Sequence, residues 1–367
     1  MRVPLQLLFL VCGVAAIWTN SVAASADPER AKLASAYGIA GAQKILSSAG
    51  RVLNAKPKTT DAPNRIALHC FAAAELMPNF GERALAAVSE DANVLASISS
   101  AGNGGEVGWS IAPGKTDSCG VPGEQNILHR GCNPVGTAYM FRTALALTCV
   151  GRAFLLTRDP RLLDVAKLAV ASSWRHGAAS PGCASCFYYW KSYSLLDIGR
   201  YVRNTNVLMG MALGTVYSAT KDPQILERIR QIAKAERMEI SAGNKGYFSI
   251  VDPQYKANPQ RESVRIENHV PYVAKGLLEI GKILGDQSLV ADAVKIEASW
   301  LDCPDAVCGG STCKHWGADR ARCDIKQQAS VCFFRKASAE FADKCRSFVL
   351  REKKFDAYEI WAALSDL

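Results

Sequence analysis

The spacing of hydrophobic positions along the chain is helical over most of its length. Residues 224–238 place three isoleucines on one stripe with charged residues opposite, which predicts an amphipathic helix. Residues 137–157 and 205–220 are apolar on nearly every side, as expected of helices buried on both sides. Strand-like alternation is scarce, and its best candidate is residues 246–251. Further helices are expected over 28–54, 64–90 and 338–364. The pattern therefore predicts an all-α protein.

An internal repeat organises these helices. A polar turn containing an aspartate recurs at Asp159, Asp222 and Asp286, which lie 63 and then 64 residues apart. In each copy an apolar helix precedes the turn and an amphipathic helix follows it, and the aspartate is placed to cap the new helix. Each unit is thus a hairpin of one inner and one outer helix. Such hairpins are expected near 133–174, 204–238 and 268–301, with weaker ones before them.

A repeating inner and outer helical hairpin in a chain of this length resembles the (α/α) toroid. That fold carries many polysaccharide lyases, uronyl hydrolases and six-hairpin glycosidases. The resemblance covers roughly residues 28–301 and is architectural, and a solenoid of helix pairs is the alternative arrangement. It implies that a substrate groove lies at one end of the barrel, lined by the starts of the inner helices and the loops before them.

The first 26 residues resemble a secretory signal peptide, with a basic start, a short apolar core and a small-residue cleavage site ending at Ala26. We therefore expect a mature chain of residues 27–367 that forms a single toroid domain. This chain is expected to be secreted or periplasmic, without stable insertion into a membrane. The 43 Lys and Arg residues exceed the 34 Asp and Glu residues, and the excess is spread along the chain. This favours an anionic partner and gives no specific sign of nucleic-acid binding.

The number of cysteines is also consistent with a secreted or periplasmic protein. Of the 13 cysteines, Cys12 lies in the leader, and the even number that remains predicts up to six disulfides in an exported chain. The Cys-rich segment 301–345 is expected to pin an extended loop onto the barrel. A zinc site at Cys183 and Cys186, or in the Cys-rich segment with His315, is the alternative. Disulfides are the favoured interpretation, and neither a metal nor another cofactor is expected.

Three polar segments fall at the heads of inner helices, at residues 132–142, 200–206 and 265–272. The repeat makes Arg142, Thr205 and His269 equivalent, so the three segments are expected to converge at one end of the bundle. Polar groups that gather at the entry to apolar helices suggest a binding site, because burying them without partners is costly.

The groups in these segments fit β-elimination from a uronate best. This reaction needs a neutraliser for the substrate carboxylate, a base for the C5 proton and an acid for the leaving oxygen. Asn268 and Arg203 are candidates for the carboxylate, and His269 or Tyr272 for the base, with a tyrosine as the acid. Asn268-His269 with Tyr272 resembles the Asn-His…Tyr grouping of toroidal alginate lyases. The match departs from that pattern, because Glu267 stands where those enzymes have Asn and Tyr272 follows the histidine by three residues instead of two.

A second group of residues is expected to contact the substrate, either near these helix starts or from aromatic loops. These residues are Arg142, Tyr201, Asn204, Asn206, Trp109 and Trp190. Structural roles remain open for several of them. The two asparagines are suited to capping a helix, and Arg203 is a possible partner of Asp197 or Glu267. The tryptophans also fit small local cores.

The sequence thus favours an exported lyase acting on an acidic polysaccharide. A glycoside hydrolase on the same fold is the first alternative, with Glu267 as acid and Asp197, Glu106 or Glu124 as base. A non-catalytic exported helical-repeat protein that binds a protein or a glycan is the second.

Overall fold

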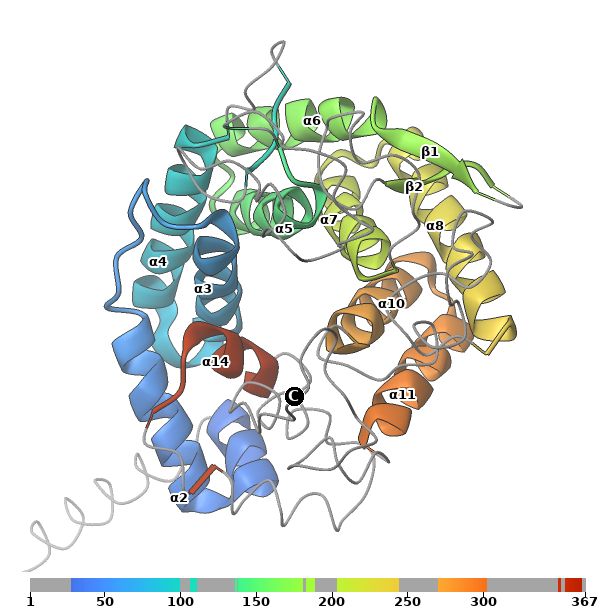
Figure 1. Ribbon diagram of the computed structural model, residues 1–367. Helices are drawn as coiled ribbons and strands as arrows, with labels where there is room; N and C mark the ends of the chain where they lie inside the picture. Colours follow the sequence, from blue (N-terminus) through green and yellow to red (C-terminus); the bar gives the residue numbers. More distant parts are fainter. Residues whose placement is uncertain are drawn as a thin grey trace, which may run out of the picture.

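The computed structural model describes residues 28–99, 106–110, 136, 138–180, 183–188, 203–243, 270–301, 349–350 and 354–364. The expected signal peptide, the candidate strand at 246–251 and the segment 302–345 lie outside these residues. Within the described ranges the helices form a ring of hairpins seen end-on in Figure 1.

Four hairpins make up most of this ring. They are α3 (Pro63–Glu75) with α4 (Met77–Ser97), α5 (Met140–Thr157) with α6 (Pro160–Trp174), α7 (Arg203–Thr220) with α8 (Pro223–Ser241), and α10 (Val270–Leu284) with α11 (Gln287–Leu301). The first helix of each pair lies on the inside of the ring and the second on the outside (Figure 1). This arrangement confirms the predicted all-α (α/α) toroid.

Helices from the two ends of the chain meet beside the first hairpin. The helix α14 (Ala357–Leu364) packs on the inner helix α3 and also contacts α2 (Pro28–Val52), which lies on the outside of the ring. Tyr37 of α2 donates a hydrogen bond to the carbonyl of Ala363, 326 residues away in the sequence. The ring is therefore held by contacts between its first and last described helices as well as by neighbouring hairpins.

Two local features differ from the expectation. The single helix predicted over 64–90 is wrong, because α3 ends at Glu75 and the residues after it are divided by a kink at Gly81, where φ is 48° and ψ is −125°. Pro78 lies in the first turn of α4, where its missing N–H costs nothing, whereas it would break a continuous helix. The other difference is a short antiparallel hairpin of β1 (Gly177–Ser180) and β2 (Cys183–Tyr188), which the hydrophobic pattern did not predict.

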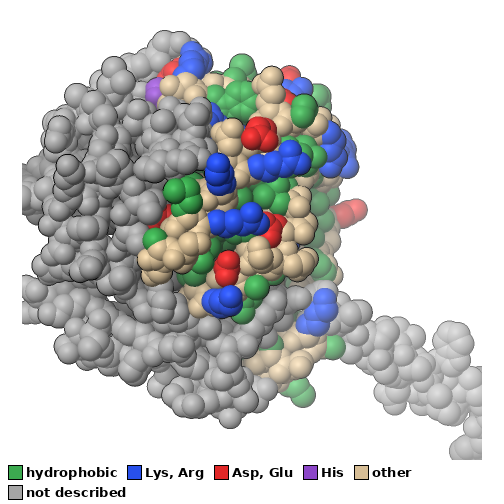
Figure 2. Space-filling view, turned by 90° about the vertical axis from the view of Figure 1, so that its right-hand side faces the viewer, with side chains coloured by type: hydrophobic (Ala, Val, Ile, Leu, Met, Phe, Trp, Pro, Cys, Tyr) green, Lys and Arg blue, Asp and Glu red, His purple; other side chains and the backbone are tan. Residues whose placement is uncertain are grey.

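The outer helices begin as the repeat predicts. Asp159 accepts a hydrogen bond from the backbone N–H of Arg161, Asp222 from that of Gln224, and Asp286 from those of Ser288 and Leu289. On the side of the ring that carries α8 and α11, Lys and Arg side chains are interspersed with Asp and Glu (Figure 2). Arg237 of α8 is ion-paired with Asp286, so one of the caps also ties two outer helices together.

The inner helices pack more closely than ordinary side chains allow. Every residue of α7 from Arg203 to Gly214 is buried, and α5 is apolar enough to resemble a membrane span, although 61% of that stretch lies inside the protein. A Cβ atom on Gly276 of α10 would lie 2.6 Å from the Cβ of Val207 and 2.8 Å from its carbonyl carbon. Glycine at this position therefore sets the distance between α7 and α10.

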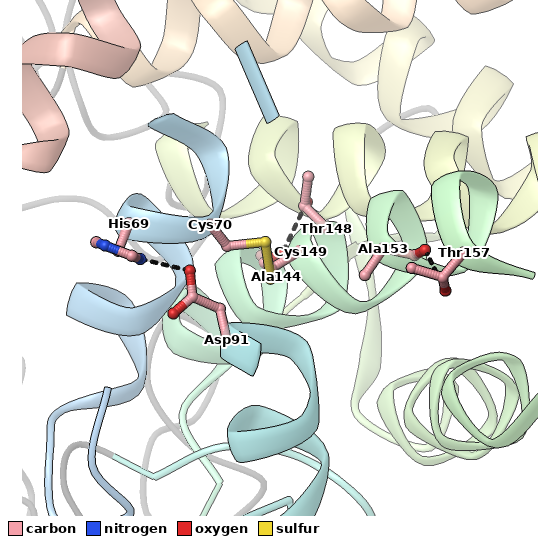
Figure 3. The surroundings of a disulfide bond; sticks show 8 residues. All are labelled: His69, Cys70, Asp91, Ala144, Thr148, Cys149, Ala153 and Thr157. Carbon is pink, nitrogen blue, oxygen red and sulfur yellow. Dashed lines mark hydrogen bonds and ion pairs between the residues drawn. A yellow bond between two sulfur atoms is a disulfide. The ribbon is translucent and has the colours of Figure 1, made fainter. Parts of the chain in front are cut away.

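A disulfide joins two neighbouring inner helices. Cys70 of α3 and Cys149 of α5 are both fully buried and are bonded to each other across 79 residues of sequence (Figure 3). This bond agrees with the predicted oxidised state of the cysteines. The side chains of the other cysteines after residue 26 lie outside the described residues.

The residue beside this disulfide belongs to a buried ion pair. The Nδ1 atom of His69 lies 2.6 Å from the carboxylate of Asp91 (Figure 3). Its Nε2 atom lies 2.7 Å from the carbonyl oxygen of Val52. Because both ring nitrogens face acceptors, both hydrogen bonds form when the imidazole is doubly protonated. Burial raises the pKa of Asp91 to about 6. Burial alone would lower the pKa of His69, but the hydrogen bond and charge of Asp91 raise it overall.

The close approach of α7 to Gly276 predicts that adding a single methyl group there lowers the stability of the protein. Gly276→Ala should lower the free energy of unfolding by about 1–3 kcal/mol, because the new methyl group meets backbone that does not move aside easily. Gly50→Ala is the matched control, since the nearest atom to its Cβ would lie 4.0 Å away. The control should leave stability unchanged or raise it by about 0.5–1 kcal/mol. Urea unfolding of both variants measures the difference, and equal effects would contradict the packing argument.

The His69–Asp91 pair predicts a pH dependence of stability. Both pKa values are higher in the folded chain than in the unfolded one, so the folded state holds more protons between about pH 4 and the pKa of His69. The stabilising contribution of the pair to the free energy of unfolding is therefore complete below this pH range, and it is lost as the pH rises through the range. A His69→Gln/Asp91→Asn variant should show a flatter profile of unfolding free energy between about pH 5 and 8 than the native protein. Glu90→Gln is the control, because the charge of Glu90 also acts on both groups. If this variant flattens the pH profile equally, the effect comes from Glu90 and not from the His69–Asp91 pair.

Candidate functional site

Aromatic side chains from separate inner helices meet on the inside of the ring. The ring of Phe141 on α5 lies 5.7 Å from that of Tyr272 on α10, and Tyr272 lies 6.0 Å from Tyr358 on α14. Tyr358 in turn lies 6.0 Å from Trp361. Figure 1 shows α7 between α5 and α10, so the first pair joins two inner helices that are not neighbours in the ring. We call Phe141, Tyr272, Tyr358 and Trp361 the axial aromatic cluster.

Arg142 lies beside this cluster in the first turn of α5. Its guanidinium carbon is 5.7 Å from the centre of the Phe141 ring. Its Nε atom is buried and has no hydrogen-bond partner within the described part of the chain. Burial lowers the pKa of Arg142, the nearby Tyr139 and Tyr272 raise it, and the positive charge of Arg65 lowers it further. A desolvated cation of this kind is stabilised by an anion with two acceptor oxygens.

The starts of the inner helices α3 and α5 differ from those of the outer helices. Among the described residues, no side chain caps the first turn of either inner helix, whereas Asp159 and Asp222 cap α6 and α8. The Oδ1 atom of Asn64, at the start of α3, is buried and likewise has no partner among the residues described. Two of the buried polar atoms without a partner among the described residues, those of Asn64 and Arg142, therefore lie at inner helix starts, which is where the toroid resemblance places the site. Asn64 was not among the candidate site residues expected from the sequence, because the residues around it are those of an ordinary helix start.

Tyr272 is a hydrogen donor at neutral pH. Burial raises its pKa well above the ordinary value, Tyr358 and Asp356 raise it further, and Arg142 opposes them. A phenol in these surroundings keeps its proton through the neutral range and well into the alkaline range. A raised pKa is compatible with the acid role expected for Tyr272, and the role itself stays a prediction.

Arg203 does not lie in this site. Its Nε and Nη2 atoms are 2.9 and 2.7 Å from one carboxylate oxygen of Glu236, and both side chains are fully buried between α7 and α8. Arg203 therefore has a buried structural partner, which is Glu236 and neither Asp197 nor Glu267 as expected, and its contact with the substrate carboxylate stays a prediction. Asn204 and Asn206 are buried in the same turn of α7, so the structure places them in the core as well.

Trp109 is also a core residue. It is fully buried, its indole N–H donates to the carbonyl of Leu95 at 2.8 Å, and its backbone N–H donates to Thr143. The alternative of a small local core holds for this tryptophan, and the expected contact with substrate does not. Glu106, a candidate base for the hydrolase, lies 2.9 Å from the Nε2 atom of His176 and near Arg175.

The remaining candidates lie outside the described residues. They are Trp190, Tyr201, Glu267, Asn268 and His269, together with the hydrolase candidates Glu124 and Asp197. In the sequence, His269 directly precedes Val270, the first residue of α10. Within the described ranges, no group of three or more His, Cys, Asp or Glu side chains is placed to hold a metal ion.

Comparison with known proteins identifies the fold. Neither a protein-family model nor a curated protein matches the sequence. The structure is similar to cellobiose 2-epimerase from Spirochaeta thermophila, with a TM-score of 0.57 and 14% identity over 88% of this chain and 83% of that chain. It is also similar to a sugar epimerase from a ruminal bacterium, with a TM-score of 0.55 and 10% identity over 81% and 77% of the two chains. A D-mannose isomerase gives a TM-score of 0.50 and 16% identity over 79% and 73%. The comparisons confirm the predicted resemblance to the (α/α) toroid of carbohydrate-active enzymes, and at such identities they concern the fold alone.

The contrast between the two arginines gives a testable prediction. Arg203→Met should lower the free energy of unfolding by about 3–5 kcal/mol, because it leaves the carboxylate of Glu236 buried without its cation. Arg142→Met should leave stability unchanged or raise it, because it removes a buried N–H that has no acceptor among the described residues. Denaturant unfolding measures both. Comparable losses in the two variants would show that Arg142 is a structural residue.

Proposed function

We propose that this protein is an exported carbohydrate-active enzyme that acts on a uronate-containing saccharide at the starts of its inner helices. The single observation that carries the proposal is the guanidinium of Arg142, which lies beside the axial aromatic cluster with its Nε atom buried and unpartnered in the described part of the chain. Export is inferred from the leader at residues 1–26 and fits the buried Cys70–Cys149 disulfide.

Charge supports an acidic substrate. Arg142 takes the carboxylate-binding role first given to Arg203, and Arg65 adds a second positive charge nearby. The first turns of α3 and α5 present backbone N–H groups at the positive ends of their helices, with no capping side chain among the residues described. Each of these features favours an anion, and a carboxylate fits a guanidinium through two parallel hydrogen bonds.

The aromatic cluster supports a sugar as the carrier of that carboxylate. Tyr272, Tyr358 and Phe141 are half-buried, so part of each ring remains open for contact. Aromatic rings pack well on apolar surfaces, such as the C–H face of a sugar, while the tyrosine hydroxyl groups hydrogen-bond its polar edge.

The favoured reaction is β-elimination. Binding of the uronate carboxylate by Arg142 stabilises the negative charge that develops when the C5 proton is removed. His269 is proposed as the base that takes this proton, since a neutral imidazole accepts protons near pH 7. As the C4–C5 double bond forms and the C4–O bond breaks, the phenol of Tyr272 donates its proton to the departing glycosidic oxygen. His269 then releases the C5 proton to solvent, and Tyr272 takes a proton back from solvent, which restores both groups.

Epimerisation or isomerisation of a sugar is the second candidate. The fold similarity to cellobiose 2-epimerase and D-mannose isomerase favours it. These reactions also begin with removal of a proton from a carbon beside a carbonyl group, so a base and a cationic neighbour serve them equally well. The glycoside hydrolase finds less support, because Glu106 is engaged with His176 and Arg175.

The reactions are separated by their products. Elimination from polyuronates such as alginate or polygalacturonate yields an unsaturated sugar that absorbs ultraviolet light, whereas epimerisation and hydrolysis do not. Tyr272→Phe should reduce turnover by about 10²–10⁴-fold. Arg142→Gln should weaken substrate binding and turnover together, because the carboxylate loses its charged partner. Arg158→Gln is the matched control, since Arg158 is exposed at the other end of the same helix and lies 5.8 Å from the ring of Phe154.

Ultraviolet absorbance and chromatography of the products provide the measurement. A new epimer or ketose without ultraviolet absorbance would establish the second candidate instead. Saccharide binding without any product would support the non-catalytic alternative.

A further inference from the structure

A second feature with binding chemistry lies on the outside of the ring. Trp174, the last residue of α6, faces the first three turns of α8 across a cleft of about 430 Å³. The cleft is lined by Trp174, Pro223, Gln224, Glu227, Arg228 and Gln231. Its volume is within the range of small-molecule sites, and none of these residues belongs to the axial aromatic cluster.

The indole presents an apolar surface to this cleft. Trp174 is half-buried and packs against the hydrophobic core on one side. Its Nε1 atom is fully buried, so the accessible part of the ring consists of carbon atoms. An exposed aromatic face beside polar groups is suited to a ligand with an apolar face and a polar edge.

The opposite wall is a row of polar side chains on one helix face. Gln224, Glu227 or Arg228, and Gln231 follow one another at helical spacing. The amide of Gln231 donates to the carboxylate of Glu227 at 3.4 Å, which orients both groups along the wall. Amide, carboxylate and guanidinium groups together offer donors and acceptors to neighbouring hydroxyl groups.

The charged residues that line the cleft are one anion, Glu227, and one cation, Arg228, so their charges cancel. The surrounding outer face also carries interspersed cations and anions (Figure 2). Such a site gives no electrostatic advantage to a phosphate or a polyanion, in contrast to the neighbourhood of Arg142. An uncharged polyhydroxylated ligand fits this chemistry best.

We propose that the Trp174 cleft is a secondary binding site for an uncharged saccharide segment. One sugar face stacks on the indole of Trp174, and the hydroxyl groups hydrogen-bond the row from Gln224 to Gln231. The site holds a polysaccharide to the outside of the ring without taking part in bond cleavage. It does not depend on the proposed function, because binding here requires no catalytic residue.

The test is calorimetric titration of the full chain with neutral hexasaccharides, namely cellohexaose, mannohexaose and xylohexaose. At least one of them should bind, and Trp174→Ala should weaken that binding about tenfold or abolish it, because the stacking contact is lost. The Gln224→Ala/Gln231→Ala variant alters only the polar wall and should also weaken binding, so it decides the outcome if Trp174→Ala fails to fold. Lys234→Ala is the control, since it is exposed on the same helix outside the cleft.

Three outcomes would overturn the proposal. They are no binding of any neutral hexasaccharide, binding that is unchanged in the folded cleft variants, and binding that is lost in Arg142→Gln but kept in the cleft variants. The last result would assign the saccharide to the axial aromatic cluster, leaving the proposed function intact. Binding that survives Arg142→Gln but not the cleft variants would establish the cleft as a separate site.

Discussion

The close packing of the inner helices is the constraint on which the rest of this structure depends. At Gly276 and Val207, α10 and α7 approach to a distance that excludes even a methyl group. Helices this close form a tight inner ring, and the ring brings the starts of α5 and α10 near enough for Phe141 to meet Tyr272. The same ring allows a buried disulfide between α3 and α5. The site therefore results from backbone packing that involves none of its own side chains.

The outer and inner helices differ in how the backbone N–H groups of their first turns are hydrogen-bonded. The outer helices α6, α8 and α11 begin at aspartates that accept those hydrogen bonds, and their faces carry charges of both signs. Within the described residues, α3 and α5 begin without such a cap and lie near buried polar atoms that have no partner. Leaving hydrogen-bonding capacity unused costs stability, and proteins accept that cost where a ligand is bound.

The two arginines illustrate this division. Arg203 and Arg142 both lie in the first turn of an inner helix, and the sequence made Arg203 a candidate for binding the substrate carboxylate and Arg142 a candidate for contacting the substrate. A carboxylate from the adjacent outer helix neutralises Arg203, which fixes the α7–α8 hairpin. Arg142 has no carboxylate from the described residues beside it and faces aromatic rings instead. Identical residue types thus have opposite roles, decided by the helix that packs beside each one.

The sequence by itself determined the helices, their repeat and the aspartate caps, because helical periodicity and capping depend on residues within one or two turns of each other. Short-range rules also explain the failures, since the kink at Gly81 and the hairpin at Gly177–Tyr188 interrupt the pattern only briefly. Only the tertiary structure decided the partners of long polar and aromatic side chains. Glu236 lies 33 residues from Arg203, and Tyr358 comes from the far end of the chain to reach Tyr272. Nothing in local spacing encodes which helix becomes a neighbour, so the burial of Trp109, the exposure of Trp174 and the unpartnered Nε of Arg142 follow from the closed ring alone.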